Sequence, residues 1–112
     1  MTISTGCDIV KIDRVLPLIE SEASSFRIFH PGELRRRDPL HAAGVFALKE
    51  AALKAFGLKA GSWLDIEVIY AENGKPSLKI SPEAHQKTIL SLDCSISHDC
   101  DYAIATVTLL EE

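Results

Sequence analysis

Hydrophobic and polar residues alternate at the start of the chain, and this alternation ends after residue 10. Residues 2–10 (TISTGCDIV) alternate between two faces and are rich in β-branched types, which predicts a strand. Residues 14–23 are expected to form a helix capped by Asp13, with Pro17 in its first turn. Residues 30–39 (HPGELRRRDP) are bracketed by proline and predict a short helix or turn.

Apolar residues dominate the middle of the chain. Residues 41–57 (HAAGVFALKEAALKAFG) predict a long helix that ends at Gly57 as C-cap, followed by a loop. This helix has no broad polar face, and a helix that is apolar all round is a buried one. Its charged residues, Lys49, Glu50 and Lys54, are therefore unexpected.

The second half of the chain alternates between strand and turn signals. Asn73-Gly74 is a strong hairpin signal between two apolar runs. Ser81 and Pro82 are typical of a helix start, so a helix is expected over residues 81–92. The predicted strands are 63–71, 76–80, 93–98 and 102–110. We therefore predict one α+β domain over residues 1–112, with a mainly antiparallel sheet packed against a long buried helix.

Composition narrows the class of protein. The chain has 112 residues, 46% hydrophobic and 25% charged, which is typical of a globular domain. It shows neither a membrane-spanning apolar run nor a signal region, so we expect a cytoplasmic protein that does not associate with membranes. Its three cysteines are expected to be free thiols. A net charge of −4 argues against a nucleic-acid partner, although Arg35, Arg36 and Arg37 form a local basic segment.

The unexpected charges have an ordinary and a functional interpretation. Glu50 and Lys54 lie one helical turn apart and could form a simple ion pair, with Lys49 reaching water. Asp8 lies in an apolar strand, where a carboxylate is costly unless it caps an irregular strand or binds a partner. Asp8 and Glu50 together indicate two carboxylates facing a hard cation, with Lys54 available for anionic oxygens.

Four motifs carry a resemblance to a known family. These are GCDIVKIDRV (6–15), FALKEAALKAFG (46–57), NGKP (73–76) and SISHD (95–99). They occur in the order found in acyl-carrier-protein synthases, the small 4′-phosphopantetheinyl transferases, and the resemblance runs from residue 6 to about 107. The combination of the glycine–x–aspartate strand with the K-E-A-x-x-K-A helix is more specific than either of the short motifs.

The resemblance implies an activity. Such enzymes move 4′-phosphopantetheine from coenzyme A to a serine of an apo acyl carrier protein and release 3′,5′-ADP in a magnesium-dependent reaction that supports fatty acid or related acyl-chain biosynthesis. It implies that Asp8 and Glu50 ligate Mg²⁺ and that Lys54 stabilises charge on the phosphoryl group. Glu50 and a metal-bound water remain alternative acceptors for the serine proton.

The resemblance also assigns binding residues. Arg14 would face the acidic carrier protein, and the basic segment 35–37 could extend that surface. Two of the coenzyme A contacts have a structural alternative: residues 73–76 could be a plain hairpin, and His98 could be a hydrogen-bonded residue at a strand end. The residues expected to bind coenzyme A are Lys49, Lys54, Gly74, Lys75, Pro76 and His98.

The family resemblance implies a homotrimer with active sites between subunits. The sequence favours it independently, because the long helix lacks a solvent face and the strand at 102–110 is apolar on both sides. We expect a three-fold ring to bury this surface.

Two departures from the family pattern leave alternatives open. Val45 replaces a frequent arginine, and GLKAGS (57–62) replaces a glycine–threonine–glycine loop, where Lys59 could supply a charge. One alternative is therefore a paralogue that binds coenzyme A or a carrier protein without catalysis. Another is a zinc-binding module that uses Cys94, His98 and Cys100.

Overall fold

The long helix predicted from the sequence lies at the centre of the fold. The structure, a computed structural model, describes residues 1–34 and 38–112. The helix α3 (Pro39–Phe56) begins after Asp38, whose carboxylate accepts a hydrogen bond from Leu40 N at 3.1 Å. It ends at Gly57, where a φ of 67° suits glycine. The predicted helix and its C-cap are confirmed, but the helix begins at Pro39 rather than at residue 41.

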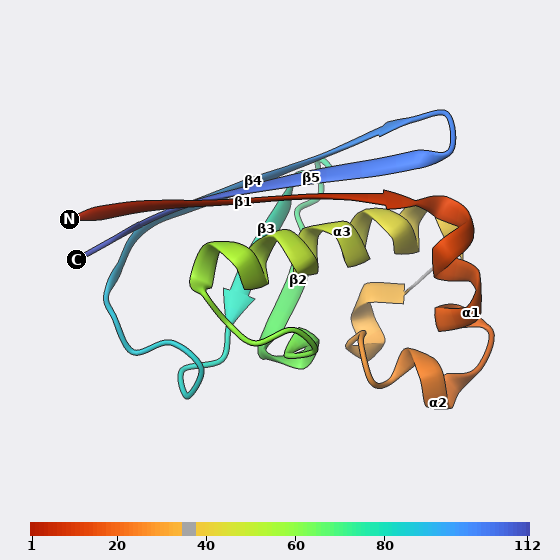
Figure 1. The fold of residues 1–112 in the computed structure, drawn as a ribbon, viewed down its shortest axis with the longest axis horizontal. Helices are drawn as coiled ribbons and strands as arrows, with labels where there is room; N and C mark the ends of the chain where they lie inside the picture. The colour runs from red at the N-terminus through yellow and green to blue at the C-terminus, as the bar shows by residue number, and fades with distance from the viewer. Residues whose placement is uncertain (35–37) are drawn as a thin grey trace.

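Two antiparallel sheets flank α3. The larger has the order β1 (Thr2–Lys11), β5 (Tyr102–Glu111), β4 (Ile89–Asp99), and Figure 1 shows it as a layer along one side of the helix. The smaller is the hairpin of β2 (Ile66–Tyr70) and β3 (Pro76–Ile80). The predicted antiparallel α+β fold is thus confirmed, with the strands divided between two sheets.

The region between β1 and α3 confirms the short helix or turn predicted within residues 30–39 but differs from the single helix predicted over residues 14–23. Its short elements are the 3₁₀ turn η1 (Ile12–Val15), α1 (Leu16–Ile19), α2 (Glu22–Ser25) and the 3₁₀ turn η2 (Pro31–Leu34). Ser21 adopts an extended conformation and caps α2 by accepting a hydrogen bond from Ser24 N, which breaks the predicted helix. Asp13 lies inside η1, and the N-cap residue of α1 is Val15, which makes no side-chain cap hydrogen bond.

The predicted helix over residues 81–92 is wrong. Ala84 N donates to Ser81 O at 3.0 Å, so a single turn forms after Ser81. From Ile89 onward the backbone instead pairs with β5, and β4 extends back to that residue. Pairing with a neighbouring strand outweighs the local helix signal, as tertiary context often does. The first three residues of the predicted strand 63–71 likewise form a 3₁₀ turn, η3 (Trp63–Asp65).

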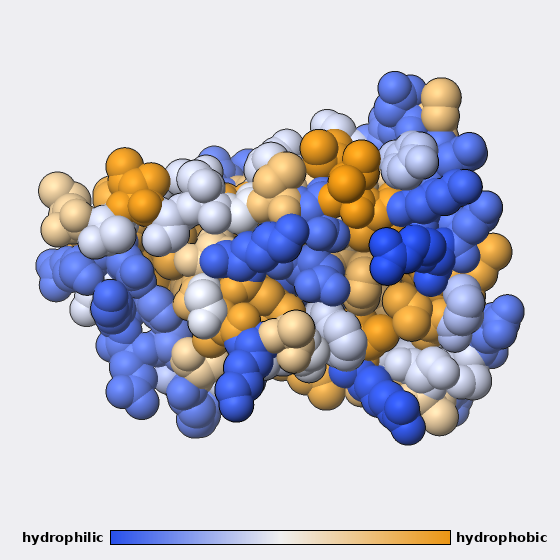
Figure 2. Space-filling model, in the orientation of Figure 1, coloured by the Kyte–Doolittle hydropathy of each residue, from blue (hydrophilic) through white to orange (hydrophobic). Residues whose placement is uncertain are grey.

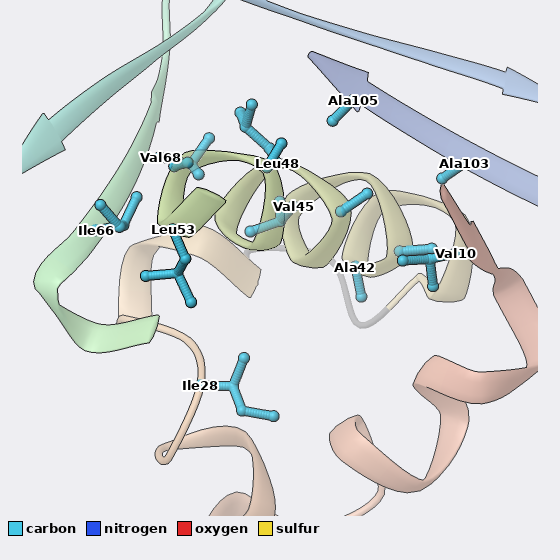
Figure 3. Close-up of a cluster of buried hydrophobic side chains, with 14 of the residues drawn as sticks. Val10, Ile28, Ala42, Val45, Leu48, Leu53, Ile66, Val68, Ala103 and Ala105 are labelled. Carbon is cyan, nitrogen blue, oxygen red and sulfur yellow. The ribbon is translucent and has the colours of Figure 1, made fainter. Parts of the chain in front are cut away.

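The core surrounds α3 and is built by the chain's own elements. Residues Ala103, Ala105, Val107 and Leu109 of β5 are buried at alternate positions and face the helix. Figure 3 shows α3 side chains between β5 and the residues Ile66 and Val68 of β2, with Ile28 on a further side. The helix indeed lacks a broad solvent face, but a single subunit already covers it. Burial of α3 is therefore no argument for a trimer.

The outer face of the larger sheet is exposed and partly apolar. Ile3 and Ile9 of β1 are 69% and 59% exposed, and Ile104 of β5 pairs with Ile9 across the strands. Figure 2 shows separate apolar patches, with more polar residues between them, along the edge of the molecule where β1 runs. The prediction that the last strand leaves apolar surface uncovered is correct for this face.

No helix within residues 1–34 and 38–112 is both long and apolar enough to cross a membrane.

Candidate active site

A close contact between β1 and α3 brings the first group of predicted residues together. A Cβ atom built on Gly6 would lie 1.8 Å from Ala51 O, so only glycine allows the strand to approach the helix this closely. Two residues later, Asp8 lies on the same face of β1, and its Oδ1 accepts from Lys54 Nζ at 3.2 Å. Lys54 Nζ also donates to Cys7 O at 2.9 Å. The sequence predicted both residues for the site, and the structure places them in contact.

Glu50 lies one helical turn before Lys54 and is half-buried. In the ranges 1–34 and 38–112, its carboxylate takes part in no hydrogen bond or ion pair. The predicted Glu50–Lys54 ion pair does not form, because Lys54 is drawn to Asp8 instead. A half-buried carboxylate without a protein donor is available to a ligand.

The second group of predicted residues surrounds a cavity of about 720 Å³, here called the His98 pocket. Its wall comes from η2, the start of α3, β2, the β2–β3 turn and β4. Residues lining it include Gly32, His41, Val68, Tyr70, Gly74 and His98. His98 Nε2 lies 3.2 Å from Leu40 O, and a Cβ atom on Gly44 would lie 3.0 Å from the same nitrogen. The structure therefore brings the hairpin turn and the predicted histidine to one cavity.

The hairpin turn is fastened to the edge strand β4. Lys75 Nζ donates to Asp93 Oδ1 at 3.0 Å, and Cys94 Sγ donates to Pro76 O at 3.4 Å. The hydrogen bond to Asp93 raises the pKa of Lys75, and the bond from Lys75 lowers the pKa of Asp93. Burial raises the pKa of Cys94, so its thiol stays protonated at neutral pH. Lys75 and Pro76 thus face β4, whereas Gly74 faces the pocket.

Lys49 has a different environment from the one predicted. Its side chain is fully buried, and Nζ donates to Glu33 Oε1 at 2.7 Å, Ile28 O at 2.7 Å and Trp63 O at 3.2 Å. These acceptors use all three donors of an ammonium group. Burial lowers the pKa of Lys49, and the hydrogen bond with Glu33 opposes that shift. Lys49 neither reaches water nor has a free donor for a cofactor, so we assign it a structural role in place of the predicted coenzyme A contact.

Sequence reasoning missed Glu33, the partner of this lysine. Glu33 is 2% exposed, and its carboxylate also accepts from His30 N and Val68 N. A lysine in an apolar helix was the only signal for such a partner, because a buried ammonium requires a buried anion. That signal does not say which of the chain's acidic residues would supply it.

The remaining predicted residues lie at the surface or outside the described ranges. Arg14 is exposed at the end of η1, next to α1. The basic segment 35–37 lies outside the described residues. Val45 is fully buried, so its side chain faces the core, and Lys59 is exposed in the loop after α3.

The alternative of a zinc module finds no support in the described residues. Cys94 is buried and its thiol contacts Pro76 O, whereas Cys100 is exposed in the β4–β5 turn. Across the parts of the chain that the structure describes, no three His, Cys, Asp or Glu residues form a metal-binding group.

The two groups of site residues lie on opposite flanks of α3. Asp8 is on β1 and His98 is on β4, the two edge strands of the larger sheet, with β5 between them. Lys54 reaches Asp8 on one flank, whereas Gly44 contacts His98 on the other.

Comparison with known proteins identifies the family of this chain. The family model of the 4′-phosphopantetheinyl transferase superfamily matches residues 4–107. The chain therefore belongs to this superfamily. It is 41% identical to the holo-[acyl-carrier-protein] synthase of Protochlamydia amoebophila, covering 94% of this chain and 95% of that one, and 42% identical to that of Geobacter sulfurreducens, covering 97% and 98%. These relatives confirm the resemblance to acyl-carrier-protein synthases.

Solved structures show the same fold. The holo-[acyl-carrier-protein] synthase of Helicobacter pylori, solved in complex with coenzyme A, superposes with a TM-score of 0.83 at 36% identity. The match covers 95% of this chain and 99% of that one.

Proposed function

We propose that this protein is a magnesium-dependent holo-[acyl-carrier-protein] synthase that acts in the cytoplasm. It transfers 4′-phosphopantetheine from coenzyme A to a serine of an apo acyl carrier protein and releases 3′,5′-ADP. The observation that carries the proposal is the flank of α3 where Asp8, Lys54 and the half-buried Glu50 gather. Within residues 1–34 and 38–112, the Glu50 carboxylate has no hydrogen-bond or ion-pair partner. Family membership supplies the reaction class, and this flank supplies the charges that the reaction needs.

Coenzyme A is proposed to place its nucleotide in the His98 pocket. Gly74 and His98 line that pocket, and its volume of about 720 Å³ lies within the usual range for ligand sites. Lys75 lies at the adjoining turn, where its exposed ammonium can contact a phosphate after leaving Asp93. Pro76 holds the turn against β4 through its carbonyl.

The carboxylates on the other flank fit Mg²⁺. This ion prefers oxygen ligands and commonly binds through one or two carboxylates together with substrate phosphates and waters. Asp8 and Glu50 would hold it, since both are oxygen donors on neighbouring elements and Glu50 lacks a donor in the described residues. When bound, the ion would supply positive charge to the pyrophosphate of coenzyme A.

The chain's own residues account for the remaining parts of the transfer. The serine oxygen bonds to the phosphorus that carries pantetheine, and the bond from that phosphorus to the bridging oxygen breaks, so that 3′,5′-ADP leaves. Lys54, which is 57% exposed, can turn from Asp8 to the transferred phosphoryl oxygens and offset their charge. Glu50 and a metal-bound water remain the two alternative acceptors for the serine proton.

A homotrimer with shared active sites is part of this proposal. The exposed apolar face of β1 and β5 supports subunit contact, and the separation of the two residue groups by β5 supports a site completed by a neighbour. Variants defective on opposite flanks should then complement each other. Mixed Glu50→Gln and Lys75→Glu subunits, dissociated and reassembled, should regain activity, because some junctions carry no substitution.

The trimer and the shared site can be tested separately. A fully active monomer in sedimentation at assay concentration would refute the trimer. A trimer that shows no complementation would refute only the shared site.

The transfer activity can be tested by measuring the mass of the carrier protein. Incubation with coenzyme A, Mg²⁺ and a panel of apo carrier proteins should add a phosphopantetheine group to a carrier, detected by intact mass spectrometry. Coenzyme A binding without a mass change on any carrier would favour the alternative, a binding paralogue without catalysis, for which Val45 and the altered loop are the motivation.

A further inference from the structure

The buried pair Glu33–Lys49 is not used by the proposed chemistry, yet its bonds lead to the wall of the His98 pocket. Glu33 Oε1 accepts from Lys49 Nζ and from His30 N, both at 2.7 Å. Glu33 Oε2 accepts from Val68 N at 2.6 Å. The carboxylate therefore joins α3 to β2 and to the segment before η2.

A further bond reaches the pocket through the backbone of Glu33. His41 Nε2 lies 2.9 Å from Glu33 O, and the His41 ring packs against Tyr70 with centroids 5.3 Å apart. His41, Val68 and Tyr70 all line the pocket, as does Gly32, the neighbour of Glu33. Three separate parts of the pocket wall are thus held by one buried residue.

Stability alone does not explain such a pair. Burying two charges costs desolvation that their attraction offsets only in part, so apolar residues of similar volume often serve stability as well or better. What apolar residues cannot supply is a fixed acceptor for Val68 N and His30 N. The pair therefore provides something that apolar residues do not: it orients the wall of the His98 pocket.

We propose that Glu33 is a positioning residue for coenzyme A and that Lys49 is its counterion. By fixing β2 and η2 relative to α3, the pair keeps the His98 pocket open at the width that the nucleotide requires before it arrives. This inference rests on the proposed function, because it takes the His98 pocket to be the nucleotide site. It replaces the direct coenzyme A contact expected for Lys49.

The test is the double variant Glu33→Leu/Lys49→Leu, which removes the bonds without leaving a buried charge unpaired. It should fold with a urea midpoint below that of the unsubstituted protein, because Val68 N loses its buried acceptor. Its KM for coenzyme A should rise about tenfold or more, as for other residues that orient a site indirectly. The KM for carrier protein and kcat should change little. Glu33→Gln/Lys49→Met keeps one acceptor oxygen and should restore part of the affinity.

Matched controls separate positioning from stability. Leu109→Ala opens a cavity in the core at a position that does not line the His98 pocket, so it should lower the urea midpoint while leaving the KM for coenzyme A unchanged. A folded double variant with the original KM for coenzyme A would overturn the inference. Failure of the unsubstituted protein to bind coenzyme A would instead refute the proposed function.

A measurement on the unsubstituted protein covers the case in which neither double variant folds. Hydrogen exchange should show the Val68 amide protected before coenzyme A is added, because Glu33 already holds it. An amide that exchanges freely until the ligand binds would show that the wall is not held in advance, and would overturn the proposal.

Discussion

Two lysines of the same helix form ion pairs with opposite properties. Lys49 and Glu33 are 2.7 Å apart and almost completely buried, and every donor of the ammonium has an acceptor. Lys54 and Asp8 are 3.2 Å apart, and the lysine is more than half exposed. A buried pair with all its donors used can orient the groups around it but cannot bind a ligand. An exposed lysine, here called the open pair with its aspartate, can release that partner and bind a ligand instead. The difference separates the residues that shape the site from those that act in it.

The largest expected effect is the loss of transfer when the open flank is altered. Asp8→Asn and Glu50→Gln each remove a charge with little change in volume, so each should lower kcat by about 10³-fold or more, roughly 4 kcal/mol in the barrier. Circular dichroism should show an intact fold. Near-normal turnover by either variant in EDTA-treated buffer would contradict the role of these carboxylates.

For the free energy of unfolding, we expect the buried pair Glu33–Lys49 to matter more than the pair Asp8–Lys54. Lys49→Met or Glu33→Gln alone leaves a buried group unpaired and should lower the free energy of unfolding by about 3–5 kcal/mol. Lys54→Met breaks a pair whose lysine is 57% exposed and should cost about 1 kcal/mol or less. Urea denaturation measures both. Similar losses for the two lysines would remove the distinction between the pairs.

The open pair depends on the close approach of β1 to α3. Gly6→Ala would place a Cβ atom against Ala51 O and should cost about 1–3 kcal/mol through backbone displacement. It should also reduce transfer, because Asp8 would move away from Lys54. Gly32→Ala is the control for stability, since a Cβ atom there has no neighbour within 4 Å. If Gly6→Ala had the stability of that control, the contact would not constrain the strand.

The smallest expected effect on activity comes from substitution of Arg14, an exposed charge outside the two ion pairs. It is exposed like Lys54 but lies at the end of η1, where we propose that the acidic carrier protein docks. Arg14→Glu should raise the KM for carrier protein about tenfold, with a steep dependence on salt, because charges at the rim of an interface act mainly on encounter. The KM for coenzyme A should stay the same. Equal effects on both substrates would argue against docking at this residue.

Local sequence determined the elements whose signals are short-range. Gly57 ends α3, Asn73-Gly74 turns the β2–β3 hairpin, and alternation defines β1 and β5. Each of these depends on the backbone conformations or the side-chain period of a few neighbouring residues. The family motifs likewise indicate Asp8, Glu50, Lys54 and His98, but not how these residues are arranged in space.

Tertiary structure decided what local signals leave open. Residues 49 and 54 point roughly 140° apart on a helix of 3.6 residues per turn, so the sequence indicates that their environments differ but not which one is buried. That choice depends on Glu33, 16 residues before Lys49 and in a separate element. Residues 89–92 became strand for the same reason, because pairing with β5 joins distant segments. Contacts between residues far apart in the chain are set by packing of the whole domain, and no short window of sequence contains them.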